Sequence, residues 1–340
     1  MFERIGRLVT LAAVFGCVLS ASAAVVIDTV PVGNPGNTGE LSGESAGGLG
    51  ADRICGAVDY VYDIGKYEIT AGQYTAFLNA VARFDTYGLY NELMWNAECP
   101  CGINRYTVQG MYHYSVSDDW AMRPVNWLTL GNAARFANWM HNGQPTGGQD
   151  LSTTEDGSYY LNGVEYPTTL VRQANATWVL PTEDEWYKAA YHKNDGVTGN
   201  YWDFPMGTDL PSIPDNGNPE GDTGNSANYI DGYDATIGAP YYTTPAGYFS
   251  LSASPYGTYD QGGNVFEMSI ISDGAQAGTL VIRGQAAMLI DFYWYALWSA
   301  FHLDGQNDGR CEVGFRLARV PEPSSLALIA LAGITVWRRR

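Results

Sequence analysis

The chain has 340 residues, in which 18 lysines and arginines face 36 aspartates and glutamates, giving a formal net charge of −18. So large a negative charge disfavours nucleic acid and anionic membrane surfaces as partners, and we expect no nucleic-acid binding. Charged residues are only 16% of the chain, whereas glycine, tyrosine, tryptophan and asparagine are plentiful. This composition indicates an irregular, hydrogen-bonded extracellular fold rather than a helical bundle.

The chain begins with the pattern of a secretory signal peptide. Arg4 and Arg7 precede an apolar run from Leu8 to Leu19, and Ala21-Ser-Ala23 supplies small residues for cleavage. The alternative is a transmembrane anchor, but the run is shorter than the roughly 20 residues that a span needs. We therefore predict a signal peptide over residues 1–23 and an exported protein.

Residues 24–57 are rich in glycine, asparagine and proline and are expected to form an irregular lead-in. The alternation over 59–64 predicts a half-buried strand, which 66–69 continues. Thr70 and Gln73 have the spacing of a capping box that starts a helix. One apolar stripe follows at helical spacing, which we assign to the core: Tyr74, Phe77, Leu78 and Val81.

Residues 85–122 have no clear period and predict an ordered loop region. A second helix is expected to start near Thr129 and to end before Gly143, a suitable residue just beyond a helix C-terminus. Its apolar stripe consists of Ala133, Phe136, Ala137 and Met140. Residues 144–175 are interpreted as an insertion that bears a hairpin.

The third helix is expected to begin at Thr182, with Glu185 completing another capping box and Trp186, Ala189 and Ala190 facing inward. The acids of its first turn, 183–185, suit the positive end of the helix dipole. We favour this structural role over catalytic acid–base chemistry. Residues 194–250 are dominated by glycine, asparagine, aspartate, proline and tyrosine, and their aromatic groups argue for packing rather than a linker.

Four cysteines lie beyond the signal peptide: Cys55, Cys99, Cys101 and Cys311. An exported chain can oxidise them. Cys99 and Cys101 are too close in sequence for a comfortable pair, so we expect one or two disulfides that involve Cys55 or Cys311. A thiolate metal site is the alternative, but this spacing is not that of a zinc site.

The stretch from Tyr256 to Met268 places an aspartate, a Gly-Gly turn, an asparagine and a glutamate within eight residues. Gly262 and Gly263 allow the backbone to turn sharply, and the carboxylates of Asp260 and Glu267 lie at either side of the turn. Hard oxygen donors on a tight loop suit Ca²⁺. The alternative is a β-turn with solvated acids.

This stretch resembles the G-N-V-W-E-W signature of the formylglycine-generating, sulfatase-modifying-factor family, written here Gly263-Asn-Val-Phe-Glu-Met268. Further family motifs follow the same order over residues 58–318: Lys66-Tyr-Glu-Ile-Thr70, Arg123-Pro-Val-Asn-Trp127, Leu180-Pro-Thr-Glu-Asp-Glu-Trp186, Arg283-Gly284 and Gly314-Phe-Arg316. The resemblance implies one α+β domain over 58–318, with a C-type-lectin-like fold of the formylglycine-generating-enzyme type that is rich in irregular structure.

The resemblance also implies two calcium sites. The first maps onto Asn228 and the carbonyl of Tyr229, with Asp231 or Asp234 as a further acid. The second maps onto Asp260, the carbonyls of Gly263 and Val265, and Glu267. Ca²⁺ is therefore the expected cofactor.

One part of the family pattern is missing. The family's oxidase chemistry uses two cysteines that bind copper, since soft thiolates are the ligands that Cu(I) requires. The interval Arg283–His302 contains no cysteine, and the two positions fall at Tyr293 or Trp294 and at Trp298 or Ser299. We therefore expect neither copper nor formylglycine-type oxidation, and we assign no catalytic residue.

A dense aromatic run occupies that interval instead: Phe292, Tyr293, Trp294, Tyr295, Trp298 and Phe301. Alternation would expose one side of this run, and exposed tyrosine and tryptophan give large contact area at low entropic cost. Tyr293, Trp294 and Trp298 are therefore our candidate ligand-binding residues. The alternative is that all six are core.

The chain closes with Val320-Pro-Glu-Pro323, an apolar segment over 326–337 and Arg338-Arg-Arg340. This arrangement resembles the PEP-CTERM sorting signal of Gram-negative bacteria. The resemblance implies exosortase-type machinery as a partner, transient membrane insertion of residues 320–340, and a location at the cell surface or in the extracellular matrix.

Two hypotheses follow. The favoured one is an exported, non-catalytic, calcium-stabilised module that binds extracellular polysaccharide or a matrix or surface protein. The alternative is a divergent family enzyme that modifies an exported protein.

Overall fold

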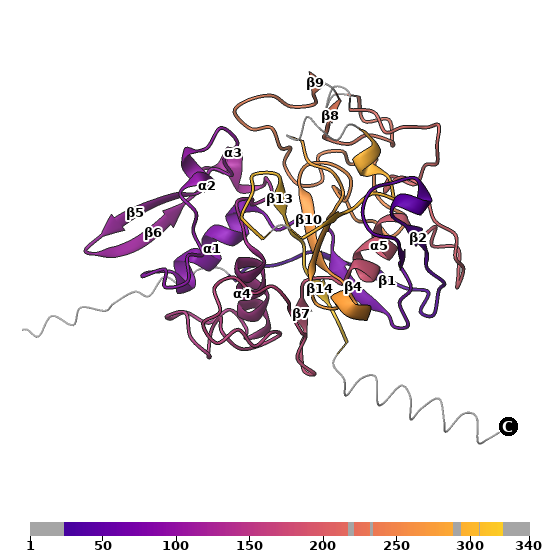
Figure 1. Ribbon diagram of the computed structural model, residues 1–340. Helices are drawn as coiled ribbons and strands as arrows, with labels where there is room; N and C mark the ends of the chain where they lie inside the picture. The colour runs from indigo at the N-terminus through magenta and orange to yellow at the C-terminus, as the bar shows by residue number, and fades with distance from the viewer. Residues whose placement is uncertain (1–23, 217–220, 232–233, 288–293, 306, 322–340) are drawn as a thin grey trace, which may run out of the picture.

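The computed structural model describes residues 24–216, 221–231, 234–287, 294–305 and 307–321. Its first sheet, in the order β1-β4-β14-β7, brings together the two ends of this described chain (Figure 1). The strands are β1 (Thr29–Val32), β4 (Tyr62–Gly65), β7 (Trp178–Val179) and β14 (Ala318–Arg319). β4 pairs antiparallel with β1 and with β14, so the lead-in and the end of the domain flank the same strand.

The second sheet has the order β12-β11-β10-β13 and carries the motif stretch. Its strands are β10 (Phe266–Ile270), β11 (Leu280–Arg283), β12 (Leu303–Asp304) and β13 (Val313–Gly314). β10 pairs antiparallel with β11 and parallel with β13, and all of its residues are buried. Because β10 has a neighbour on both sides, Glu267 lies deep in the molecule.

Three longer helices begin at the expected residues: α1 (Ala71–Val81), α4 (Leu130–His141) and α5 (Glu183–Tyr191). Thr70, Thr129 and Thr182 cap them, and the capping boxes predicted for α1 and α5 are both present. All stripe residues predicted for α1, α4 and α5 are buried. Gly143 follows α4 with a positive φ of 78°, as expected for a residue just past a helix end.

The helices pack through aromatic rings. The ring centroid of Phe136 lies 5.3 Å from that of Phe77 on α1 and 5.6 Å from that of Phe315, which follows β13. These edge-on contacts join α1, α4 and the second sheet in one core, to which such rings contribute through large buried areas.

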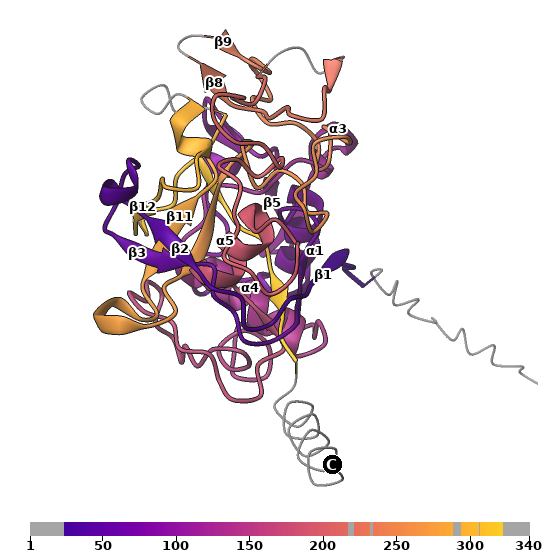
Figure 2. The same cartoon turned by 90° about the vertical axis from the view of Figure 1, so that its right-hand side faces the viewer.

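Short elements complete the chain. These are β2 (Glu40–Ser42), β3 (Arg53–Cys55), β5 (Asn104–Val108), β6 (Met111–Ser115), β8 (Ile230–Asp231), β9 (Asp234–Ala235), α2 (Leu93–Asn96), α3 (Asp118–Ala121) and the 3₁₀ turns η1 (Glu44–Ala46), η3 (Gly274–Gln276) and η4 (Trp294–Leu297). The hairpin of β5 and β6 extends from the body beside α2 and α3 (Figure 1). Figure 2 shows the β2–β3 hairpin beside β11 and β12.

Three local predictions were wrong. Residues 66–69 do not continue β4, because the N–H of Lys66 donates to the Asp28 carbonyl and the N–H of Ile69 donates to the Phe315 carbonyl. The loop region 85–122 contains the β5–β6 hairpin. Residues 144–175 contain no strand, only a bridge between Tyr159 and Arg172.

The insertion 144–175 lacks a hairpin because side chains of α4 take the place of a partner strand. The Asn138 amide donates to the carbonyls of Thr154 and Tyr159, both at 2.8 Å. Asn142 donates in the same way to Thr153 and Asp156. Backbone carbonyls that would otherwise need a strand are thereby satisfied.

Among the residues that the structure describes, no helix combines the length and the apolar character required to cross a bilayer. The predicted signal peptide over 1–23 and the apolar segment over 326–337 both lie outside the described residues.

Candidate functional site

The motif turn is held by two neighbouring segments of chain. Gly263 has a φ of 96°, and a side chain there would come within 2.5 Å of the Asn228 carbonyl oxygen. Its N–H donates to the Gly284 carbonyl at 2.6 Å, while the N–H of Asn264 donates to that of Asn228 at 2.7 Å. Only glycine fits such a close approach of two backbones. The two predicted calcium sets, around Asn228 and around Asp260, therefore lie side by side.

Asn264 joins these segments through its side chain. Its Oδ1 accepts from the Asn228 amide and from the N–H of Thr244, both at 2.8 Å. Its Nδ2 donates to Glu68 Oε2 at 3.1 Å. A side chain that both donates and accepts is required here, and asparagine also tolerates the φ of 64° at this position.

Glu267 forms a buried ion pair with Arg316. The carboxylate accepts from the guanidinium at 2.5 and 2.6 Å, and Trp186 Nε1 donates to the same carboxylate at 2.8 Å. Arg316 also donates to the carbonyls of Gly65 and Tyr259. Both charged groups have no exposed surface, so this pair connects β10, α5 and the first sheet at the centre of the molecule.

Two further acids lie close to this pair. Burial, followed by the neighbouring Asp260 carboxylate, raises the pKa of Glu68 well above its ordinary value. Burial also raises the pKa of Asp260 from 3.8 to about 6. Glu68 Oε1 is buried and has no hydrogen-bond partner. Three carboxylates thus share the single cation of Arg316, and the surplus negative charge favours a proton or a cation.

The residues of the predicted calcium sites differ in whether their oxygen atoms are free to bind an ion. Asn228 Oδ1 is buried without a partner, so it could bind a cation. The Tyr229 carbonyl already accepts from Thr236 at 3.1 Å, and both Glu267 oxygens are engaged by Arg316. Gly263 and Val265 lie in the buried turn between them. The part of the chain that the structure describes holds no cluster of three or more His, Cys, Asp or Glu suited to a metal, and calcium stays a prediction.

A second charged network surrounds Arg283. Its guanidinium donates to Glu183 at 2.6 Å and to the carbonyls of Ser299 and Phe301, both at 2.9 Å. Burial tends to raise the pKa of Glu183, but the positive charges of Arg283 and Arg53 outweigh this effect and lower the pKa to about 2. Glu185 is paired in the same way with Arg172. Glu183 and Glu185 at the start of α5 therefore stabilise the fold, and their ion pairs add to the predicted helix-dipole effect.

The cysteines form one disulfide, between Cys99 and Cys311, with Cα atoms 6.0 Å apart. This confirms a bridge to Cys311 and the absence of a Cys99–Cys101 pair. Cys55 and Cys101 are free and buried, so of the one or two disulfides predicted to involve Cys55 or Cys311, the described residues form the one to Cys311. Burial raises the pKa of Cys55 to about 12 and that of Cys101 to about 11.

Within the described part of the interval that lacks the family's cysteines, Trp294–Leu297 forms the 3₁₀ turn η4 rather than an alternating strand. Trp298 is half-buried, and its Nε1 donates to Asp203 at 3.0 Å. Trp294 is also half-buried and packs edge-on against Phe204, whereas Phe301 is fully core. Tyr293 lies outside the described residues.

These features define a mixed α+β domain built around a buried motif turn. Its residues 57–321 match the model of the sulfatase-modifying factor enzyme 1-like domain, and the chain belongs to this family. Residues 319–340 match the PEP-CTERM protein-sorting motif, which indicates exosortase-mediated sorting and export to the cell envelope of a Gram-negative bacterium.

The chain is also similar to solved structures at low identity. "Treponema denticola variable protein 1" is 17% identical with a TM-score of 0.51, and the match covers 88% of this chain and 97% of that one. CarF (19% identity, TM-score 0.46, 87% and 99% covered) and PvdO from Pseudomonas aeruginosa (16%, 0.43, 87% and 92%) align less closely in space. No curated protein matches significantly. The predicted family and its α+β fold type are confirmed, while the relation to C-type lectins stays a prediction.

Sequence reasoning gave no role to the groups that hold the site together: Glu68, Asn264 and Arg316. All three stand inside quoted motifs: Glu68 in Lys66–Thr70, Asn264 in Gly263–Met268 and Arg316 in Gly314–Arg316. A charged residue among apolar neighbours is buried and needs a partner, which is the signal that could have identified this network.

Proposed function

We propose that the protein is an exported, non-catalytic binding module whose ligand is an extracellular polysaccharide or a matrix or surface protein. After insertion through its C-terminal segment and processing by the sorting machinery, it acts at the cell surface or in the extracellular matrix. The proposal rests chiefly on one observation: Trp298 is partly exposed yet fixed in place by its hydrogen bond to Asp203.

The setting of Trp298 and Trp294 supports binding. Both rings pack on a buried apolar cluster formed by Phe204, Met206, Ala227, Tyr229 and Leu297. A ring held in place in this way loses little entropy when its exposed part contacts a ligand. The Asp203 carboxylate beside it can accept hydrogen bonds from hydroxyl groups.

The state of the cysteines supports the absence of family chemistry. The interval Arg283–His302 has none, Cys99 and Cys311 are joined, and the other two thiols have raised pKa values. Since the thiolate is the reactive form, no cysteine beyond the signal peptide is prepared to act as a nucleophile or copper ligand. The predicted calcium remains part of the proposal, with Asn228 as its best-suited residue.

The test is retention of the full chain on exopolysaccharide from the producing organism. A Trp294→Ala/Trp298→Ala variant should lose retention, while Trp95→Ala, which removes a 48% exposed tryptophan from α2, should keep it. Equal retention by the wild type and both variants, or an equal loss in the two variants, would remove the aromatic site from the proposal. If exported proteins from a deletion strain differed in mass from those of the parent strain, the enzyme hypothesis would replace it.

A further inference from the structure

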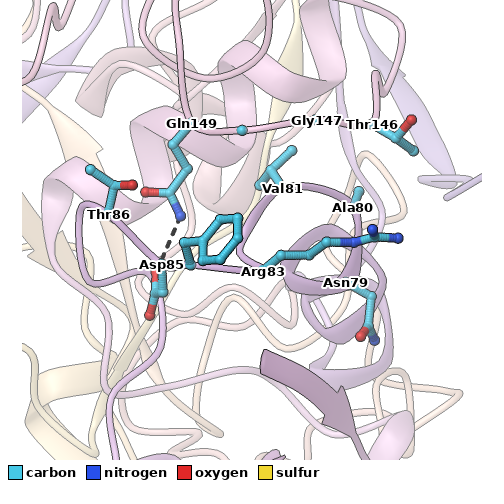
Figure 3. A pocket seen from close by; sticks show the side chains of 11 residues that line it. Asn79, Ala80, Val81, Arg83, Asp85, Thr86, Thr146, Gly147 and Gln149 are labelled. Carbon is cyan, nitrogen blue, oxygen red and sulfur yellow. Dashed lines mark hydrogen bonds between the residues drawn. The ribbon is translucent and has the colours of Figure 1, made fainter. Parts of the chain in front are cut away.

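A pocket of about 320 Å³ lies between the end of α1 and the loop 146–149, formed by other segments than those that carry Trp294 and Trp298. The N–H of Gly147 donates to the Ala80 carbonyl at 3.0 Å and fixes this loop against the helix. Figure 3 shows Gln149 and Asp85 on one side of the pocket and Thr146 on the other. Its volume is at the lower end of the range for small-molecule sites.

The floor of this pocket is rigid because Asp85 is fully engaged. Its carboxylate accepts from the N–H groups of Leu89 at 2.7 Å and Tyr90 at 3.1 Å, and from Gln149 Nε2 at 3.2 Å. Arg105 lies 3.6 Å away and balances its charge. The Asp85 side chain is only 3% exposed, so its charge is shielded from a ligand in the pocket.

Arg83 stands out among the basic residues. Every other lysine and arginine in the described ranges has an ion pair, a hydrogen bond or an aromatic ring as a partner, but the Arg83 side chain has none. In a chain with a net charge of −18, acids to pair with are abundant. An exposed guanidinium left free at a pocket is therefore available to an anionic ligand, most favourably to a carboxylate, which it can bind through two hydrogen bonds.

The rest of the lining suits a ligand with many oxygens and one apolar face. The Phe84 ring is 71% exposed. The hydroxyls of Thr86 and Thr146 and the N–H of Gly148 make no hydrogen bond within the described chain, and a side chain built at Gly148 would meet no atom within 4 Å. These groups can bind hydroxyls while the aromatic ring contacts the C–H face of a sugar.

We infer that this pocket binds an acidic sugar, a single uronate residue within a polysaccharide, since a net charge of −18 disfavours a densely charged polyanion but not one carboxylate at Arg83. Arg83 binds the carboxylate, Phe84 packs against the ring, and Thr86, Thr146 and Gly148 contact the hydroxyls. This site is additional to the aromatic surface at Trp294 and Trp298, so an experiment can refute one proposal without refuting the other.

The experiment is calorimetric titration of the full chain with tri-galacturonate and, separately, with its neutral methyl ester. The acid should bind at least about tenfold more tightly than the ester, since a hydrogen bond to a charged group is worth about that factor. Arg83→Gln should cost about the same factor and Arg83→Lys less, because lysine keeps the charge but loses the two-point geometry. Added salt should weaken binding of the acid and leave that of the ester unchanged.

Controls separate this site from other effects. Arg310→Gln removes an equal charge from a 41% exposed side chain elsewhere and should leave binding unchanged. Phe84→Ala should weaken both ligands, whereas Trp294→Ala/Trp298→Ala should weaken neither. Equal affinity for acid and ester, or an Arg83→Gln variant that binds normally, would overturn the assignment. If tri-glutamate competed as well as tri-galacturonate, the pocket would be a peptide carboxylate site and the sugar assignment would be wrong.

Discussion

We expect the two members of the buried Glu267–Arg316 pair to differ in how much stability is lost when each is replaced. Removing one member of a buried ion pair usually costs about 3–5 kcal/mol, because the other is left uncompensated. Here the two choices differ. Glu267→Gln leaves Arg316 beside Asp260, which still offsets its charge at pH 7. Arg316→Met leaves three neighbouring carboxylates without a cation and also frees the Gly65 and Tyr259 carbonyls.

We therefore expect Arg316→Met to lower the free energy of unfolding by about 5 kcal/mol at pH 7 and Glu267→Gln by about 3 kcal/mol. Urea unfolding followed by tryptophan fluorescence measures both. The cost of Arg316→Met should shrink towards pH 5, because protonation removes the unbalanced charge. Arg310→Met, at an exposed pair with Asp308, should cost less than about 1 kcal/mol. If Glu267→Gln cost as much as Arg316→Met, the argument from three carboxylates and one cation would be refuted.

Three further predictions concern the same framework. The pKa of Asp260 is raised from 3.8 to about 6, so the folded state binds the proton more tightly and stability should fall as pH rises between these values. Asp260→Asn should remove this part of the pH profile of unfolding. An unaltered profile in the variant would contradict the prediction. The Cys99–Cys311 disulfide spans 212 residues, so a double serine variant should lose up to about 5 kcal/mol, and dithiothreitol should bring the urea midpoint of the wild type down to that of the variant. Calcium should raise the melting temperature of the wild type and not that of Asn228→Ala, in a scan with and without EDTA; no response in either protein would remove calcium from the account.

The helices could be predicted because their signals are local. Threonine at the N-cap, a partner three residues later and an apolar stripe all lie within one or two turns of the same segment. Thr70 and Thr182 illustrate this, since each cap bonds as its spacing implies. The insertion 144–175 could not be predicted in the same way, because its backbone is satisfied by Asn138 and Asn142 from a helix that precedes it.

In the site, too, local features could be predicted from the sequence and contacts between distant residues could not. The motif turn and the importance of Gly263 followed from residue types and from a family pattern. The partner of Glu267 did not, because Arg316 is 49 residues away and nothing in the local sequence states that the two side chains meet. The choice among three possible cysteine pairings likewise depends on distant segments that only the fold brings together.

Equilibrium binding of the full chain to exopolysaccharide from its producing organism tests the central claim most directly. The account predicts saturable binding by the wild type, at least about tenfold weaker binding by Trp298→Ala because a packed aromatic contact is lost, and a cooperative urea transition which shows that the variant is folded. Identical binding by a folded Trp298→Ala variant, or no binding to polysaccharide or to surface proteins by either form, would contradict it.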